Sequence, residues 1–211
     1  MKKFELTAES KINIFGKKLF RIKALISFGD VEEGETGGWI EKEENLEQSS
    51  GNAWVSGNAE VYGNARVSGN ARVSGNAGVY GDAEVYGNAG VYGNAEAYGD
   101  AEVYGNAWVY GNARVYGDAE VYGNARVSGN AEVYGNADYT TIHGFGTQFR
   151  TTTFFQCEDK QIRVSCGCFL GTIPEFREQV KNTREGKIAE EYLMIADLME
   201  KHFVKEKESG E

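Results

Sequence analysis

A six-residue unit, Gly-Asn/Asp-Ala-x-Val-Tyr/Ser, fills residues 51–140 and restricts the possible folds of this chain more than any other feature. The unit occurs fifteen times in register, without an insertion. Self-similarity at a fixed short period is the signature of solenoids, in which each unit packs only against its neighbours. The repeat therefore predicts a solenoid, but its Gly, Asn, Ala and Val residues offer no nucleophile, base or metal ligand.

The order of residues within the unit predicts how the chain turns. Ala and Val are two positions apart, so in an extended segment they share one face, while x and Tyr point to the other. Gly followed by Asn or Asp supplies residue types that tolerate left-handed backbone angles. We expect short strands with an Ala/Val core, separated by a corner every six residues.

A variant of the unit gives the number of units in each coil. Gly-Asp-Ala-Glu-Val-Tyr begins at Gly81, Gly99 and Gly117, so copies lie eighteen residues apart. Three units to a coil would stack every third unit on one face, with rungs ~4.8 Å apart. Five such coils would rise roughly 24 Å.

This pattern resembles the left-handed parallel β-helices of hexapeptide-repeat acyltransferases, where three units close a triangular coil. The resemblance implies a homotrimer, the usual state of those enzymes. Terminal rungs of a solenoid need caps. We predict a mainly β chain: an N-terminal β cap at residues 1–50, a left-handed parallel β-helix of about five three-sided coils at 51–140, and a small α+β domain at 141–211.

The two ends carry expected elements of their own. In the N-terminal cap, residues 4–6, 12–15 and 19–26 are typical of short strands. Residues 34–41 are typical of a turn that leads into the β-helix. After Tyr139 the period fails, and residues 147–156 and 161–169 alternate as two strands. Thr172-Ile173-Pro174-Glu175 is a capping box that opens a helix with Phe176 and Val180 inward. A last helix is expected from the helical spacing of Ile188, Tyr192, Ile195, Met199 and Phe203, before a charged tail.

Both ends also resemble a known group of proteins. Gly37-Gly38-Trp39-Ile40-Glu41 resembles the beginning of the repeat in phage and bacterial hexapeptide-repeat proteins. Ile142-His143-Gly144-Phe145-Gly146 and Val164-Ser165-Cys166-Gly167-Cys168-Phe169-Leu170-Gly171-Thr172 resemble the C-terminal part of tailed-phage and prophage members. The resemblance implies a phage-encoded protein of the host cytoplasm; the group is named for transferases but has no settled activity.

Composition excludes several partners. A net charge of −10 argues against a nucleic-acid polymer. No stretch approaches the ~20 apolar residues of a membrane span, and the charged start of the chain is unlike a signal peptide. Three cysteines, all in the C-terminal part, suit reduced thiols. We expect a cytoplasmic protein without a membrane partner.

Sorting the outward side chains by coil predicts three different faces. The first is a tyrosine face, which either only stabilises stacked rungs or binds another protein. The second is an acidic stripe, whose repulsion is relieved by solvent, by cations or by a neighbouring chain. The third mixes Trp54, Arg72, Trp108 and Arg126 with Tyr92 and Tyr110. The tyrosine face comprises Tyr62, Tyr80, Tyr98, Tyr116 and Tyr134. The acidic stripe comprises Glu84, Glu102 and Glu120 beside Tyr86, Tyr104 and Tyr122, with Asp82, Asp100 and Asp118 at its corner as weak cation candidates.

Candidate chemistry lies after the repeat. His143 would be the general base only if the chain is an acyltransferase, and the repeat has no inserted loop to form an acceptor site. Cys157, Cys166 and Cys168 with His143 are zinc-ligand types, yet Cys-x-Cys lacks the usual knuckle spacing, which favours buried thiols. Residues 144–153 combine flexible backbone, hydroxyls and one Arg that suit an anion, or else form a capping loop. The candidate ligand residues are Gly144, Gly146, Thr147, Arg150, Thr151 and Thr153.

Three functions remain open at this point. The first hypothesis is a non-catalytic phage-type structural or interaction protein, a rigid prism that self-associates as a trimer and engages a partner. The second is a protein that binds an anionic small molecule, such as a nucleotide signal of host defence. The third is an acyltransferase. No cofactor and no metal are expected, with Glu84, Glu102 and Glu120 as weak cation candidates beside the three aspartates, and whether the chain is an enzyme is left undecided.

Overall fold

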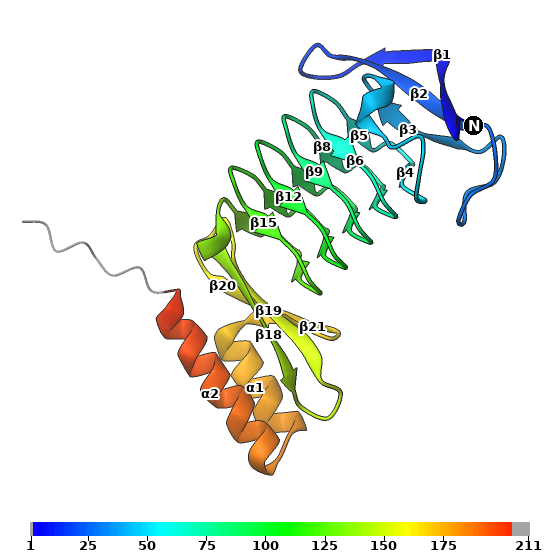
Figure 1. Cartoon of the computed structure of the whole chain (residues 1–211). Coiled ribbons are helices and arrows are strands. Elements are labelled where there is room, and N and C mark those ends of the chain that lie inside the picture. The colour runs from blue at the N-terminus through cyan, green and yellow to red at the C-terminus, as the bar shows by residue number, and fades with distance from the viewer. Residues whose placement is uncertain (1, 204–211) are drawn as a thin grey trace, which may run out of the picture.

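A parallel β-solenoid of about five coils forms the centre of the molecule (Figure 1). A strand-rich N-terminal part precedes it, and an antiparallel sheet with two helices follows it. The structure is a computed structural model that describes residues 2–203. The charged tail expected after Phe203 lies outside these residues.

The solenoid consists of two-residue strands, one in each of the first fourteen units, that form three parallel sheets. The first sheet, which carries the tyrosine face, contains β3 (Thr36–Ile40), β5 (Glu60–Val61), β8 (Gly78–Val79), β11 (Glu96–Ala97), β14 (Arg114–Val115) and β17 (Glu132–Val133). The second, which carries the acidic stripe, contains β6 (Arg66–Val67), β9 (Glu84–Val85), β12 (Glu102–Val103) and β15 (Glu120–Val121). The third contains β4 (Trp54–Val55), β7 (Arg72–Val73), β10 (Gly90–Val91), β13 (Trp108–Val109) and β16 (Arg126–Val127).

The strand register confirms the three-unit coil. Glu102 pairs with Glu84 on one side and with Glu120 on the other. Each partner lies eighteen positions away, as the spacing of the Gly-Asp variant predicts. In the first fourteen units the Ala and the Val, or Ala97 in place of Val, are buried, and Ala101 and Val103 have no exposed surface. The core is therefore one continuous column of small aliphatic side chains.

Glycine at the corners is required by both backbone angle and space. Gly81 has a φ of 74°, and a Cβ there would lie 3.0 Å from the backbone nitrogen of Gly99 on the next coil. Gly135 instead has a φ of −149°, and the chain leaves the solenoid there through η2 (Asn136–Asp138). The fifteenth unit therefore starts the next sheet instead of adding a rung.

The N-terminal part extends the first sheet. β1 (Phe4–Ile12) and β2 (Lys18–Ala24) form an antiparallel hairpin, and β2 pairs with β3. The expected strand at residues 12–15 is wrong: Asn13 Oδ1 accepts hydrogen bonds from the backbone nitrogens of Phe15 and Lys17, which makes a turn. The turn expected at residues 34–41 contains β3, because Trp39 donates from its backbone to Ala59.

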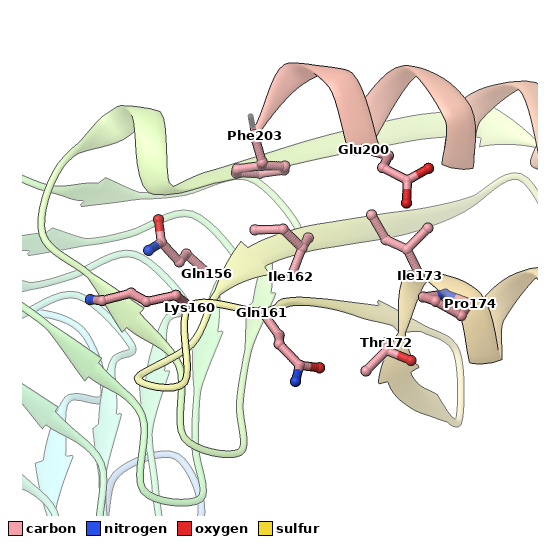
Figure 2. A pocket seen from close by; sticks show the side chains of 9 residues that line it. All are labelled: Gln156, Lys160, Gln161, Ile162, Thr172, Ile173, Pro174, Glu200 and Phe203. Atoms are coloured by element: carbon pink, nitrogen blue, oxygen red, sulfur yellow. The ribbon is translucent and has the colours of Figure 1, made fainter. Parts of the chain in front are cut away.

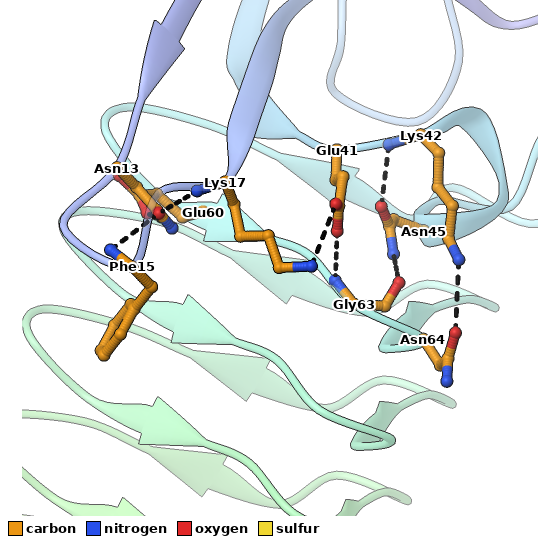
Figure 3. A network of polar contacts seen from close by, with 9 residues as sticks. All are labelled: Asn13, Phe15, Lys17, Glu41, Lys42, Asn45, Glu60, Gly63 and Asn64. Carbon is orange, nitrogen blue, oxygen red and sulfur yellow. Dashed lines mark hydrogen bonds and ion pairs between the residues drawn. The ribbon is translucent and has the colours of Figure 1, made fainter.

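A short helix and a polar network hold this part to the solenoid (Figure 3). In η1 (Glu43–Asn45), the amide of Asn45 donates to the backbone oxygens of Gly63 and Ala65, at 3.2 and 2.8 Å. Glu41 accepts from Lys17 and from the backbone nitrogen of Gly63, at 3.4 and 2.7 Å. The first coil is thus capped by the buried and half-buried hydrogen bonds of Asn45 and Gly63 and by the exposed one between Lys17 and Glu41.

The C-terminal part contains four strands where two were expected. β18 (Tyr139–Phe145), β19 (Arg150–Gln156), β20 (Ile162–Cys166) and β21 (Phe169–Thr172) form an antiparallel sheet, followed by α1 (Ile173–Thr183) and α2 (Gly186–His202). The expected capping box is confirmed: Thr172 Oγ1 accepts from Glu175 N at 3.3 Å, and Glu175 Oε2 accepts from Thr172 N at 2.7 Å. No helix within the described residues is long and apolar enough to span a membrane.

The C-terminal sheet lies between the last coil and the two helices (Figure 1). Alternate side chains of β19 point to the solenoid side and to the helix side of this sheet. Phe155 belongs to the core that continues through the solenoid, whereas Phe154 packs with the helices around Phe176. The sheet is thus the cap that closes the C-terminal end of the solenoid core.

Candidate functional site

The tyrosine face is a stack of parallel rings. The Tyr62–Tyr80 and Tyr80–Tyr98 ring centroids are both 4.9 Å apart, with interplanar angles of 3° and 4°. Tyr116 continues the stack, and Tyr134 is turned by 64° at its end. Exposure rises along the stack, from 7% at Tyr62 to 60% at Tyr134. The rings therefore bury their faces against one another.

The β1–β2 turn lengthens this face. The ring of Phe15 lies 6.2 Å from that of Tyr62 and 6.0 Å from that of Tyr80. Ile14 beside it is 92% exposed, and Phe15 itself is 61% exposed. Asn13 donates to Glu60 at 3.2 Å, so the turn is fixed to the solenoid (Figure 3). We call Ile12, Ile14 and Phe15 the hairpin tip.

Two glutamates of the acidic stripe accept hydrogen bonds from tyrosines of the same chain. Tyr86 Oη donates to Glu102 Oε2 at 2.7 Å, and Tyr104 Oη donates to Glu120 Oε2 at 2.8 Å. The pKa of Tyr104 is raised to about 12, chiefly by the hydrogen bond to Glu120 and secondly by burial. The sequence suggested that solvent, cations or a neighbouring chain relieve the repulsion between the carboxylates. The tyrosine hydroxyls also relieve it, and this was not predicted. The sequence does place a Tyr sixteen positions before each of these glutamates, but this spacing marks only a possible partner.

The three corners of the solenoid differ in their side chains. Two carry columns of asparagines linked by amide hydrogen bonds, such as Asn94 Nδ2 to Asn112 Oδ1 at 3.0 Å. In the third corner, Asp82 accepts from Asn64 at 3.0 Å, but Asp100 and Asp118 are exposed carboxylates. Among residues 2–203, no group of three or more His, Cys, Asp or Glu side chains is placed to hold a metal ion.

The third face is partly covered by the N-terminal part. Trp54 is buried against the rings of Phe4 and Phe28, at centroid distances of 6.4 and 5.6 Å. Arg72 forms an ion pair with Asp30. Further along, the guanidinium of Arg126 lies 5.5 Å from the ring of Trp108.

The C-terminal histidine and cysteines are spread over the sheet. His143 is exposed on β18. Cys157 is buried against the solenoid core, where burial raises its pKa to about 11. Cys166 accepts from Thr152 Oγ1 at 3.2 Å, and Cys168 is exposed. All three thiols are free.

The structure divides the six candidate ligand residues. Gly146, Thr147 and Arg150 line one cavity of about 840 Å³, which does not include Gly144. Thr153 lies on the opposite side of the sheet, where its Oγ1 accepts from Arg126 N at 3.0 Å. Thr151 shares that side, because residues two apart on a strand share a face. The cavity is also lined by Lys181, Arg184 and Tyr192, and no motif of the sequence indicates a role for these three residues in ligand binding.

A second cavity, of about 600 Å³, lies between β20 and the ends of the helices (Figure 2). Each of its two charged side chains already forms an ion pair with a residue outside the lining. Lys160 lies 3.6 Å from Glu132, and Glu200 lies 2.7 Å from Arg177. The cavity thus has little unbalanced charge to attract an ionic ligand.

Parts of the repeat match a known family of solenoid repeats. Residues 59–75, 65–81, 107–123 and 119–135 match the family described as YdcK Beta solenoid repeat. No curated protein matches the chain. Together with the stacked coils, these matches make the chain a repeat β-solenoid protein.

Proposed function

We propose that this chain is a structural interaction protein that binds further copies of itself through the tyrosine face and the hairpin tip, as a homotrimer. One observation carries the proposal: Phe15 joins the exposed Ile14 to the tyrosine stack, which gives a single apolar strip. Contiguous apolar strips rimmed by polar residues mark interaction surfaces, and interface cores are enriched in aromatic residues.

The other two faces offer less to a partner. Glutamates of the acidic stripe accept hydrogen bonds from Tyr86 and Tyr104. The beginning of the third face is covered through Trp54 and Arg72. The tyrosine face, in contrast, ends at exposed Tyr134, and Tyr80, Tyr98 and Tyr116 are half-buried.

A second copy suits this surface by shape. The rungs of one flat solenoid face repeat at ~4.8 Å, and the same face of another copy repeats at the same interval. Aromatic edges and the hairpin tip can therefore interlock along the whole strip. The resemblance of both ends of the chain to phage and prophage hexapeptide-repeat proteins supports a phage-encoded member that works in the host cytoplasm.

Sedimentation velocity on matched variants tests the proposal. Tyr134→Ser and Tyr122→Ser each remove an exposed ring at the end of a stack, with 60% and 51% exposure, but on different faces. Tyr134→Ser is expected to weaken self-association about tenfold or more, because aromatic residues dominate interface energetics. Tyr122→Ser is the control and is expected to leave it unchanged.

The hairpin tip provides an independent variant. Ile14→Ser with Phe15→Ser is expected to shift the assembly to monomers, while circular dichroism shows an intact fold, since Ile14 is exposed and Phe15 largely so. A monomeric wild-type chain at micromolar concentration would contradict the proposal. An equal effect of Tyr134→Ser and Tyr122→Ser would also contradict it.

A further inference from the structure

The cavity of about 840 Å³ lies on the helix side of the C-terminal sheet. The β18–β19 loop supplies Gly146 and Thr147, and β19 supplies Arg150. The end of α1 and its connection to α2 supply Lys181 and Arg184. Its volume falls in the range of small-molecule sites, about 300–1,000 Å³.

The charge around this cavity is unbalanced. Arg150, Lys181 and Arg184 line it, and Glu185 is its one acidic lining residue. None of the three cations forms an ion pair with another side chain of residues 2–203, although Arg163, Arg177 and Lys187 in the same domain do. In a chain with a net charge of −10, this gathering of cations suits an anion.

The position of Arg150 is set by its surroundings. A Cβ at Gly167 would lie 2.5 Å from Arg150 Nη1, so the guanidinium rests against this glycine. Gly167 also has a φ of 64°, which favours glycine. The guanidinium of Arg150 therefore lies beside the β20–β21 turn, where glycine leaves room for it.

Aromatic rings form a fixed apolar part of the lining. Phe176 meets the ring of Phe169 at a centroid distance of 5.5 Å and that of Tyr192 at 5.8 Å. Tyr192 Oη donates to the backbone oxygen of Phe145 at 3.2 Å, which holds its ring under the β18–β19 loop. A ligand in this cavity meets cations and rings together.

We infer that the cavity binds a small organic anion, with its phosphate or carboxylate group held by Arg150, Lys181 and Arg184 and its ring against Phe169. A nucleoside monophosphate represents this class. The site is independent of self-association through the tyrosine face.

Cys168 is exposed and lines the cavity, so the rate at which its thiol is modified reports whether a ligand occupies the cavity. The full-length chain is treated with N-ethylmaleimide in the presence of adenosine monophosphate, adenosine or inorganic phosphate, and modification of each thiol is followed by mass spectrometry. Isothermal titration calorimetry gives the affinities. Adenosine monophosphate is expected to bind saturably and to slow modification of Cys168 severalfold. Phosphate is expected to compete at higher concentration.

Charge variants locate the site. Arg150→Ala and Arg184→Ala are each expected to weaken binding of adenosine monophosphate about tenfold or more, because a charge-assisted hydrogen bond is lost. Lys187→Ala is the matched control: it removes a positive charge from α2 outside the cavity lining, and binding is expected to persist.

Three outcomes would overturn the inference. The first is no saturable binding of adenosine monophosphate together with unchanged modification of Cys168. The second is binding of adenosine as tight as that of adenosine monophosphate, which would remove the role of the anion. The third is an equal effect of Arg150→Ala, Arg184→Ala and Lys187→Ala.

Discussion

Tyr86 and Tyr104 each donate a hydrogen bond to the glutamate one coil further along the solenoid. Both partners come from the same column of repeat units, so one interaction is copied along the stripe. The like charges of neighbouring rungs would otherwise destabilise the sheet. At the scale of single residues, the repeat therefore supplies hydrogen-bond donors to Glu102 and Glu120 of its acidic stripe, while Asp100 and Asp118 stay exposed.

This pairing predicts a stability change at alkaline pH. The pKa of Tyr104 is raised from 10.0 to about 12, chiefly by its hydrogen bond to Glu120. A raised pKa stabilises the fold fully below the pKa of the unfolded chain, and this contribution is lost as the pH rises through the folded value. The stability advantage of the wild type over Tyr104→Phe is therefore expected to be constant below pH 10 and to shrink between pH 10 and 12. Urea denaturation of both proteins across this range measures it; a pH-independent difference would contradict the assignment.

The corner of stacked aspartates predicts a stabilising substitution. In Asp100→Asn the new amide can donate to Asp118, as Asn64 donates to Asp82, and a like-charge contact is removed. We expect a gain of about 1 kcal/mol in the free energy of unfolding at low salt, smaller at high salt. Asn94→Asp in an asparagine column is the reverse control, and urea denaturation should show a loss. Destabilisation by Asp100→Asn would mean that the carboxylate has a partner of its own.

Residue columns were predictable, whereas the bonds between them were not. The eighteen-residue spacing is enough to assign Tyr62 and Tyr80 to one face. The Tyr104–Glu120 bond, however, depends on how a side chain leans between coils. That direction is decided by packing against neighbouring rings, which no periodic pattern contains.

At the scale of elements, β19 joins two cores with alternate side chains. Phe155 completes the solenoid core, and Phe154 belongs to the core beneath α1 and α2. The alternation also explains why the candidate ligand residues separate, with Arg150 on the helix side and Thr153 on the solenoid side. The sequence shows the alternation, but it does not show that both sides are covered.

The two faces of β19 can be distinguished by substitution. Phe154→Ala and Phe155→Ala both remove a fully buried ring, and each is expected to cost about 3–5 kcal/mol. Hydrogen exchange followed by mass spectrometry should show faster exchange in the last coils for Phe155→Ala and in α1 and α2 for Phe154→Ala. The same pattern in both variants would show that the two cores open as one unit.

The end segments were harder to predict than the solenoid for a physical reason. Trp39 on β3 pairs with Glu60, and Tyr139 on β18 pairs with Phe155. Both strands form through contacts distant in sequence, so the glycines around β3 suggested a turn instead. The α1 capping box was predictable because all its groups lie within four consecutive residues.

At the scale of the whole molecule, the solenoid holds the hairpin tip and the C-terminal cavity at opposite ends (Figure 1). The same unit recurs along the whole distance, and each coil rests only on its neighbours. A gain or loss of eighteen residues would change the separation by one rung, ~4.8 Å, and would keep every column aligned. A gain of six would instead turn the C-terminal end by one side of the prism. Recombination between repeat units can therefore change the length of this protein in whole turns, while the hairpin tip and the C-terminal sheet keep their orientation relative to each other.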